Sequence, residues 1–295
     1  MRYFSTFTGI GGLDMGLEKM GAECVGFSEI KESSIRIYKK HYPSHQYFGD
    51  ITKLDLKTLP DFDLFVGGFP CQSFSISGAR KGFTDRRGQM IFHIYDILKE
   101  KQPEFFVLEN VKGITMHDHG KTYRNVIKLL TSAGYSVRCL LLNAANYGSV
   151  QGRERIVFIG RRGKDFEAKN PVVTDNTKRF RDIRDNDKTH YKFITEATIK
   201  RMEENRGRFS VIGGYDRVNT ITTGVSSSGR TMLLVQVEDG RFRNITELEA
   251  ERIQGFPDGW TEGESSARRW FALGNAVNCR MSEYLFNDYL KGLWW

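Results

Sequence analysis

The first 160 residues alternate short apolar runs with amphipathic stretches, and this alternation restricts the chain to few architectures. Helical spacing places Leu13, Leu17 and Met20 on one face, and similar faces recur over residues 90–98 and 126–130. The apolar runs predict strands over residues 2–7, 24–28, 46–48, 64–66, 105–108, 136–142 and 155–159. Such alternation is typical of βαβ units, so the sequence predicts an α/β fold around a mostly parallel sheet.

The character of the chain changes near residue 163. Beyond this point the apolar runs shorten, charged residues crowd together, and residues 213–229 are rich in Gly, Ser and Thr. Amphipathic patterning resumes near residue 241. We therefore expect a main domain over residues 1–162, a small domain over residues 163–240, and a return to the main domain over residues 241–295.

Composition excludes several classes of protein. No uninterrupted apolar run reaches the roughly 18 residues that cross a bilayer, and residues 1–6 read as a strand, so we expect a cytoplasmic protein with no membrane partner. The 4 cysteines lie far apart without a CxxC pair, and the His-Asp-His segment at residues 117–119 lacks further ligands, so no metal is expected. The net charge of +8 permits a polyanionic partner without requiring one.

A glycine-rich turn follows the first expected strand and reads Phe7-Thr8-Gly9-Ile10-Gly11-Gly12, with a helix beginning near Leu13. Glycines there let backbone amides approach an anionic group at a helix N-terminus. Glu29 ends the second strand, at the position expected for a carboxylate that binds a ribose hydroxyl. Asp50 and Ile51 follow the third, where they could hold an adenine ring. The GxGG spacing favours a nucleoside with a short charged tail, such as S-adenosylmethionine, over a dinucleotide.

Cys71 follows the fourth expected strand, at the edge where parallel sheets bind ligands. The loop after it, residues 73–88, carries four basic side chains, whose charge would favour a thiolate. Glu109 ends the fifth strand, which places a carboxylate near the same edge. A buried cysteine and a helix-capping glutamate are the plain alternatives. Together, however, a thiolate and a proton donor suit addition to C6 of cytosine, which prepares C5 to accept a methyl group from a sulfonium. The sequence does not identify the base that would remove the C5 proton.

Five ordered motifs resemble those of DNA (cytosine-5)-methyltransferases of bacterial or phage type. They are residues 7–12, Pro70-Cys71-Gln72, Glu109-Asn110-Val111, Gln151-Gly152-Arg153-Glu154-Arg155 and Gly274-Asn275-Ala276-Val277. The resemblance implies a Rossmann-like S-adenosylmethionine-dependent methyltransferase fold with a small target-recognition domain. It also implies the activity EC 2.1.1.37: methyl transfer to C5 of a flipped-out cytosine in a specific duplex DNA sequence, through a covalent bond between Cys71 and C6, with S-adenosylhomocysteine as product.

The resemblance also assigns residues. It implies that Cys71 is the nucleophile, that Glu109 contacts N3 and the exocyclic amine, and that Arg153 and Arg155 position the flipped cytosine and its phosphate. The cofactor site would comprise Phe7, Thr8, Gly9, Ile10, Gly11, Gly12, Leu13, Glu29, Ile30, Asp50, Ile51, Gly68, Pro70, Met90, Asn275, Ala276 and Val277. Contacts with DNA are expected from Gln72, Ser73, Ser75, Arg80, Lys81, Arg87, Thr220, Thr222 and Gly224. Residues 246–257 resemble the segment that braces the recognition domain.

A cytosine inside a duplex is unreachable, so it must be swung out of the stack. This requires a closing loop, expected at residues 73–88, and a groove reader, expected within residues 161–240, where sixteen Lys or Arg stand against twelve Asp or Glu. We expect a monomer that associates with the nucleoid through double-stranded DNA. The recognition sequence, and a separate cognate restriction endonuclease as a further partner, stay open.

Three other functions are weighed against this one. The first is a tRNA cytosine-5 methyltransferase of the same family, although the chain lacks the Cys-Phe-Thr tripeptide of that branch. The second is a nucleotide-binding oxidoreductase or thiol hydrolase, which fits the GxGG turn and the pair Arg153 and Arg155 poorly. The third is an inactive DNA-binding homologue, which Cys71 and Glu109 argue against.

Overall fold

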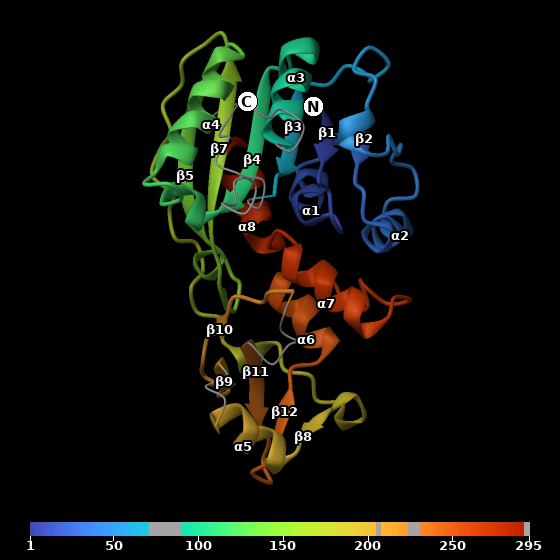
Figure 1. Ribbon diagram of the computed structural model, residues 1–295, viewed down its shortest axis with the longest axis vertical. Coiled ribbons are helices and arrows are strands. Elements are labelled where there is room, and N and C mark those ends of the chain that lie inside the picture. The colour runs from blue at the N-terminus through green and yellow to red at the C-terminus, as the bar shows by residue number, and fades with distance from the viewer. Residues whose placement is uncertain (71–89, 205–207, 224–230, 292–295) are drawn as a thin grey trace.

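The chain forms two lobes, each built around its own sheet (Figure 1). The computed structural model describes residues 1–70, 90–204, 208–223 and 231–291. The large lobe holds a six-stranded sheet and the small lobe a four-stranded sheet, and helices α6 and α7 lie between them. No helix in the described ranges is long and apolar enough to cross a bilayer.

The large sheet has the strand order β2-β1-β3-β4-β7-β5. Its strands are β1 (Arg2–Thr6), β2 (Glu23–Ser28), β3 (Leu64–Gly68), β4 (Phe105–Val111), β5 (Tyr135–Asn143) and β7 (Glu154–Arg162). Strands β2, β1, β3 and β4 pair in parallel, whereas β7 runs antiparallel to both of its neighbours. The predicted α/β class with a mostly parallel sheet is therefore confirmed.

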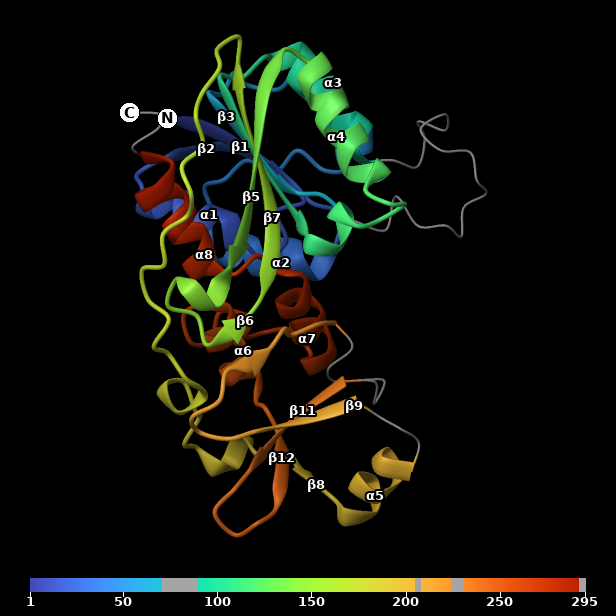
Figure 2. The same cartoon turned by 90° about the vertical axis from the view of Figure 1, so that its left-hand side faces the viewer.

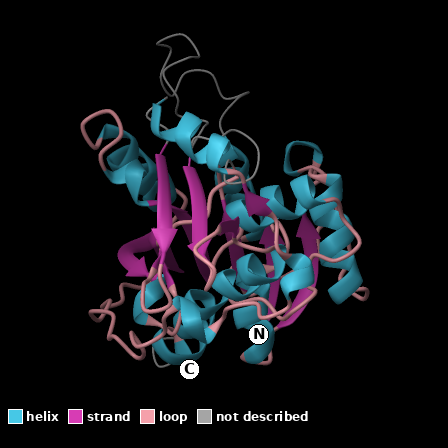
Figure 3. Cartoon of the chain, turned by 90° about the horizontal axis from the view of Figure 1, so that it is seen from below, coloured by secondary structure: helices cyan, strands magenta, loops and turns pink. Residues whose placement is uncertain are grey.

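Helices cover both faces of the large sheet, because consecutive strand residues point to opposite sides (Figures 2 and 3). On one face Val66 and Val107 pack with Leu17 of α1 (Gly12–Lys19) and with the chain after α8. On the other, Phe65 and Phe106 pack with α3 and α4. The remaining elements of this lobe are α2 (Glu32–His41), α3 (Met90–Lys101), α4 (Lys121–Ser132), α8 (Cys279–Glu283), the short helices η1 (Ile51–Lys53), η5 (Lys112–Thr115) and η6 (Ala144–Asn146), and the π-helix η9 (Tyr284–Tyr289).

The strand predicted over residues 46–48 is wrong. The structure has a single bridge there, between Phe27 and Tyr47. Phe27 donates its amide to Gln46 and accepts from Phe48, both at 2.9 Å, and Gly49 then turns the chain with a φ of 85°. Asp50 consequently ends no strand. It caps η1 by accepting from the Thr52 amide at 2.9 Å.

The small lobe contains a sheet of order β8-β12-β11-β9, and a separate two-stranded pairing, β10 with β6, joins it to the large lobe. These strands are β6 (Gln151–Gly152), β8 (Phe193–Ile194), β9 (Arg208–Ile212), β10 (Val218–Asn219), β11 (Thr231–Gln236) and β12 (Phe242–Asn244). The helices are η7 (Phe180–Asp182), η8 (Lys188–His190), α5 (Glu196–Glu204), α6 (Glu247–Gln254) and α7 (Ser266–Asn275). Because β12 belongs to this sheet, the small lobe extends past the boundary expected at residue 240, to Asn244.

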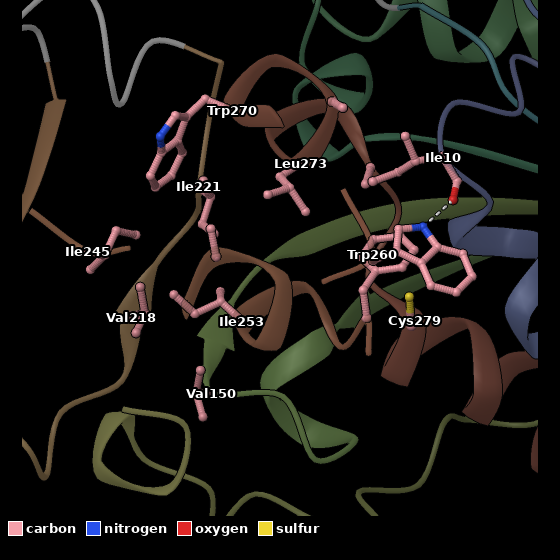
Figure 4. Close-up of a cluster of buried hydrophobic side chains, with 14 of the residues drawn as sticks. Ile10, Val150, Val218, Ile221, Ile245, Ile253, Trp260, Trp270, Leu273 and Cys279 are labelled. Carbon is pink, nitrogen blue, oxygen red and sulfur yellow. Dashed lines mark hydrogen bonds between the residues drawn. The ribbon is translucent and has the colours of Figure 1, made fainter. Parts of the chain in front are cut away.

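A buried apolar cluster holds the two lobes together (Figure 4). Ile253 of α6 and Leu273 of α7 pack there with Ile221 from the small-lobe side. Trp260 reaches the large lobe, where its indole nitrogen donates to the Ile10 carbonyl at 3.0 Å. The glycine-rich turn therefore packs directly against the helices that carry the small lobe.

Asp14 of α1 is a fully buried carboxylate with three hydroxyl donors. Tyr38, Tyr3 and Ser5 donate to it at 2.7, 3.2 and 3.3 Å. Burial raises the pKa of Asp14 to about 6, although the three hydrogen bonds oppose the shift. Since the folded-state pKa exceeds that of the unfolded chain, Asp14 adds stability that is complete below pH ~4 and is lost as the pH rises through about 6.

Replacing Asp14 with asparagine is expected to remove that pH dependence, because the amide stays neutral and can still accept from the tyrosines. A shift of about two pKa units corresponds to about 3 kcal/mol. We therefore expect the difference in Tm between Asp14→Asn and wild type to become more positive by several degrees between pH 4.5 and pH 7.5. Thermal unfolding of both proteins at the two pH values measures it. An unchanged difference would contradict the assigned pKa.

Candidate active site

A cavity lies beyond the carboxyl ends of β1 and β3. We call it the strand-end cavity. Its lining residues belong to β1, the turn after it and the start of α1, to the ends of β3 and β4, and to the end of α7 with the turn that follows. They are Ser5, Phe7, Thr8, Gly9, Leu13, Asp14, Gly68, Glu109, Asn275, Ala276 and Val277. In folds of this class, ligands bind at this edge of the sheet. The cavity thus gathers residues from motifs that lie far apart in the sequence.

The glycine turn, residues 7–12, forms one wall of the strand-end cavity. Phe7, Gly9 and Gly11 have φ values of 51°, 59° and 90°, in the left-handed region. At Gly12, a Cβ atom would lie 2.2 Å from the carbonyl oxygen of Val277. Only glycine therefore lets the start of α1 approach the opposite wall so closely.

Glu29 orders this turn from outside the cavity lining. Its Oε2 accepts from the Gly9 amide at 2.8 Å, and its Oε1 accepts from the amides of Ile30 and Lys31 at 2.8 Å each. Ile30 is 69% exposed beside it. One carboxylate therefore fixes both the glycine turn and the entry to α2, and leaves an apolar side chain facing solvent.

Glu109 and Arg155 form an ion pair at the opposite wall. Arg155 Nε lies 2.7 Å from Glu109 Oε1, and both side chains are 11% exposed. They sit on one face of the antiparallel strands β4 and β7, in diagonal positions, because Glu109 pairs with Val157 and Arg155 pairs with Val111. Oε2 lies on the side of Gly68, where a Cβ atom would be 3.3 Å away. The guanidinium therefore holds one carboxylate oxygen and leaves the other beside the cavity.

Asn110 is not among the predicted site residues, yet it supports the chain that leads to Cys71. Its Nδ2 donates to the Phe69 carbonyl at 2.9 Å, and its Oδ1 accepts from the Val111 amide at 2.8 Å. Pro70, exposed, is the last described residue before Cys71. The predicted site residues Cys71, Gln72, Ser73, Ser75, Arg80, Lys81, Arg87 and Gly224 lie outside the described residues.

Arg153 lies among backbone carbonyls beside the strand-end cavity lining residues Asn275 and Ala276 rather than in that lining itself. It is 2% exposed and does not line the strand-end cavity. Its guanidinium donates to the carbonyls of Ile221, Gly274 and Ala276 at 3.0, 3.2 and 2.8 Å. The two terminal nitrogens thus bond to backbone from two separate segments, while the buried Nε has no hydrogen-bond partner among the described residues.

The other predicted residues divide into two groups. Phe7, Thr8, Gly9, Leu13, Gly68, Asn275, Ala276 and Val277 line the strand-end cavity with Glu109. Ile10, Gly11, Gly12, Glu29, Ile30, Asp50, Ile51, Pro70 and Met90 do not, and of these Ile51 is only 5% exposed within the core. Thr220 donates its hydroxyl to the Gly152 carbonyl at 2.7 Å, whereas Thr222 is exposed.

Sequence reasoning missed two residues of the cavity, Ser5 and Asp14. Ser5 lies inside an apolar strand, and Asp14 lies in the first turn of α1, where acidic residues are common. The spacing of nine residues between them shows no pattern that would bring them together. Their proximity follows from the tertiary packing of α1 on β1.

A second cavity lies where the small lobe meets α6 and α7. Its walls include His190, Lys192, Glu247 and Trp270. None of these four follows a strand of the large sheet, so we place the chemistry at the strand-end cavity.

Comparison with known proteins decides the family. Residues 1–291 match the family described as C-5 cytosine-specific DNA methylase. The chain belongs to this family. Among its relatives, the type II methyltransferase M.NlaX of Neisseria lactamica is 35% identical over 285 residues, covering 92% of this chain and 90% of the relative. The type II methyltransferase M.HhaI of Haemophilus parahaemolyticus is 31% identical over 304 residues, covering 97% and 93%.

Solved structures support the same fold for this C-5 cytosine-specific DNA methylase. Dnmt2 methyltransferase of S. pombe superposes with a TM-score of 0.84 at 22% identity, covering 100% of both chains. The methyltransferase EhMeth of Entamoeba histolytica gives 0.81 at 19% identity, covering 99% and 98%. The predicted S-adenosylmethionine-dependent methyltransferase fold and the predicted family are confirmed.

Proposed function

We propose that this methylase transfers the methyl group of S-adenosylmethionine to C5 of a flipped-out cytosine in a specific sequence of double-stranded DNA, through a covalent bond between Cys71 and C6. The observation that carries the proposal is the Glu109–Arg155 pair, which borders a cavity whose other walls are the glycine turn and residues 275–277. Domain limits follow the lobes, with the small lobe as the target-recognition domain.

The described residues fit the cofactor. S-adenosylmethionine carries an ammonium and a sulfonium, and the carboxylate of Asp14 lines the strand-end cavity. The amide-rich turn at Phe7 to Gly9 and the turn at residues 275–277 would enclose the methionine end. Exposed Ile30, next to Glu29, would cover the adenine, with Glu29 and Asp50 at the edge of the nucleoside. When bound, the cofactor supplies an electrophilic methyl group.

Glu109 would supply the proton. Addition of the Cys71 thiolate to C6 of cytosine places negative charge on the ring, which proton donation to N3 relieves. Arg155 holds Oε1 of Glu109, so that Oε2 can face the base. After methyl transfer a base, which the sequence does not identify, takes the C5 proton, the bond between sulfur and C6 breaks to restore the thiolate, and the N3 proton returns to Glu109. Arg155 would thus position the carboxyl group of Glu109 for its contact with the base.

The small lobe would face the duplex. Thr222 of this lobe is exposed, and residues 73–88 lie outside the described residues; we assign both to the DNA-contacting parts that base flipping requires. We place Gln72, Ser73, Ser75, Arg80, Lys81, Arg87, Thr220 and Gly224 in the same proposal. Binding of a monomer to DNA by such contacts should weaken steeply with salt.

Trapping tests the covalent step. A duplex with 5-fluorocytosine at the target position cannot lose its C5 substituent as a proton, so the protein should remain bound to the DNA after denaturation. Cys71→Ala is expected to abolish both trapping and methyl transfer while S-adenosylhomocysteine still binds. Cys139→Ala, a half-buried cysteine of β5, is the matched control and should retain both.

Three results would contradict the proposal: methyl transfer by Cys71→Ala, no trapping by wild type, or label from radioactive cofactor in tRNA alone. Bisulfite sequencing of DNA from a host that expresses the protein identifies the target sequence needed for these duplexes. The same sequencing reports whether any cytosine is methylated at all.

A further inference from the structure

Arg153 is a buried cation that the proposed chemistry does not use. The residue is 2% exposed, and none of the described residues places a carboxylate at ion-pair distance from its guanidinium. Burial lowers the pKa of Arg153 accordingly. Burying an unpaired charge is expensive, and Nε of Arg153 has no hydrogen-bond partner among the described residues, so the bonds of its terminal nitrogens are what offset the cost. Three backbone carbonyls accept from its two terminal nitrogens.

These carbonyls belong to two segments with different tasks. Ile221 lies in the recognition segment, which we define as residues 220–223. Gly274 and Ala276 flank Asn275, which lines the strand-end cavity, and we call residues 274–277 the return turn. One guanidinium therefore bonds to the DNA-facing lobe and to the cofactor side at once.

The two segments also touch directly. A Cβ atom on Gly274 would lie 2.5 Å from the Thr223 amide nitrogen and 2.6 Å from the Thr222 carbonyl carbon. The return turn meets the glycine turn equally closely, at Val277 and Gly12. No side chain separates these backbones, so a shift of one segment must move the next.

Gln151 completes the attachment of Ile221. Its Oε1 accepts from the Ile221 amide at 2.7 Å, while its Nε2 donates to Gln254 at 3.1 Å. Gln254 in turn donates to the Leu273 carbonyl at 2.5 Å. The Ile221 N–H thus donates to Gln151 and its C=O accepts from Arg153. Both Gln151, through Gln254, and Arg153 are hydrogen-bonded in turn to the end of α7.

We propose that Arg153 is a positioning residue that couples cofactor binding to DNA binding by bridging the return turn and the recognition segment. This inference rests on the proposed function. When the cofactor orders the return turn, Arg153 would restrain the position of Ile221. When DNA binds the recognition segment, Arg153 would restrain the position of the return turn. Linkage requires the two effects to be equal, and couplings of this kind are about 5–150-fold.

The experiment measures the dissociation constant of S-adenosylhomocysteine with and without a short duplex that carries the target sequence. Wild type is expected to bind the product at least about fivefold more tightly with DNA present. In Arg153→Met, which keeps the length of the side chain and removes its donors, the ratio should fall to about one. Arg153→Gln, whose side chain is shorter and ends in one nitrogen, cannot reach both segments, so it should behave in the same way and serves if Arg153→Met fails to fold.

A matched control removes another buried arginine of the lobe junction. Arg243 and Glu249 form a fully buried pair at 2.7 Å that touches neither segment. The double variant Arg243→Met/Glu249→Met should change the Tm but keep the wild-type ratio of the two dissociation constants for S-adenosylhomocysteine.

The outcomes separate the two ideas. A wild-type ratio in Arg153→Met or Arg153→Gln, a ratio near one in wild type, or loss of the ratio in the control would each overturn the coupling role while leaving methyl transfer intact. Failure of wild type to bind either ligand would instead remove the proposed function.

Discussion

Glu109→Gln is expected to lower kcat for methyl transfer by about 10²–10⁴-fold, the range for loss of a general acid. Glutamine keeps the shape of Glu109 but cannot transfer a proton to N3 of the base. It also loses the charge that pairs with Arg155 at 2.7 Å, so the amide would be held less firmly beside the cavity. Binding of S-adenosylhomocysteine should change little, because only the base contacts this carboxyl group in the proposed mechanism.

Single-turnover methylation of a duplex that carries the target sequence measures this effect. Glu104→Gln is the matched control, because Glu104 immediately precedes the same strand at its opposite end and is exposed. Its rate should equal that of wild type. A Glu109→Gln rate within about threefold of wild type would remove proton donation by this residue from the mechanism.

Gly12→Ala should have the second large effect. The new Cβ would lie 2.2 Å from the Val277 oxygen and 3.0 Å from its carbonyl carbon, so two backbones must separate. Overpacking of this kind costs about 1–3 kcal/mol. Since residues 275–277 line the strand-end cavity, we expect affinity for S-adenosylhomocysteine to fall by about tenfold or more, together with a lower Tm.

Isothermal titration and thermal unfolding give the two quantities. Gly113→Ala controls for the loss of a glycine, since its Cβ would meet only Val111 Cγ2 at 3.9 Å. Wild-type affinity in Gly12→Ala would show that the contact between α1 and residue 277 does not shape the site.

Much of the large lobe could be predicted because its signals are local. Short, continuously buried apolar runs mark β3 and β4, and helical spacing marks α1, α3 and α4. Residues 46–48 look like a strand for the same local reasons, yet Gly49 turns the chain after one bridge. The antiparallel direction of β7 and the place of β12 in the small sheet depend on connections that apolar patterning does not encode.

The candidate site shows a similar division. Residues directly after strands, such as Gly9 and Gly68, could be placed at the cavity because parallel strands share one functional edge. Arg153 could not be placed, because Gln151-Gly152-Arg153-Glu154-Arg155 does not say which arginine turns inward. In β7, Arg155 reaches Glu109, whereas Arg153 precedes the strand and is enclosed by backbone carbonyls.

The strand-end cavity takes its walls from both halves of the chain, residues 5–14 and residues 275–277. Ribosomes release a polypeptide from its amino end, at about 5–20 residues per second. The early strands can pair while synthesis continues, but the pocket stays without its last wall until residues 275–277 have emerged. A product that ends before residue 275 would therefore lack the wall against which the glycine turn packs, and with it the shape of the cofactor site that we propose.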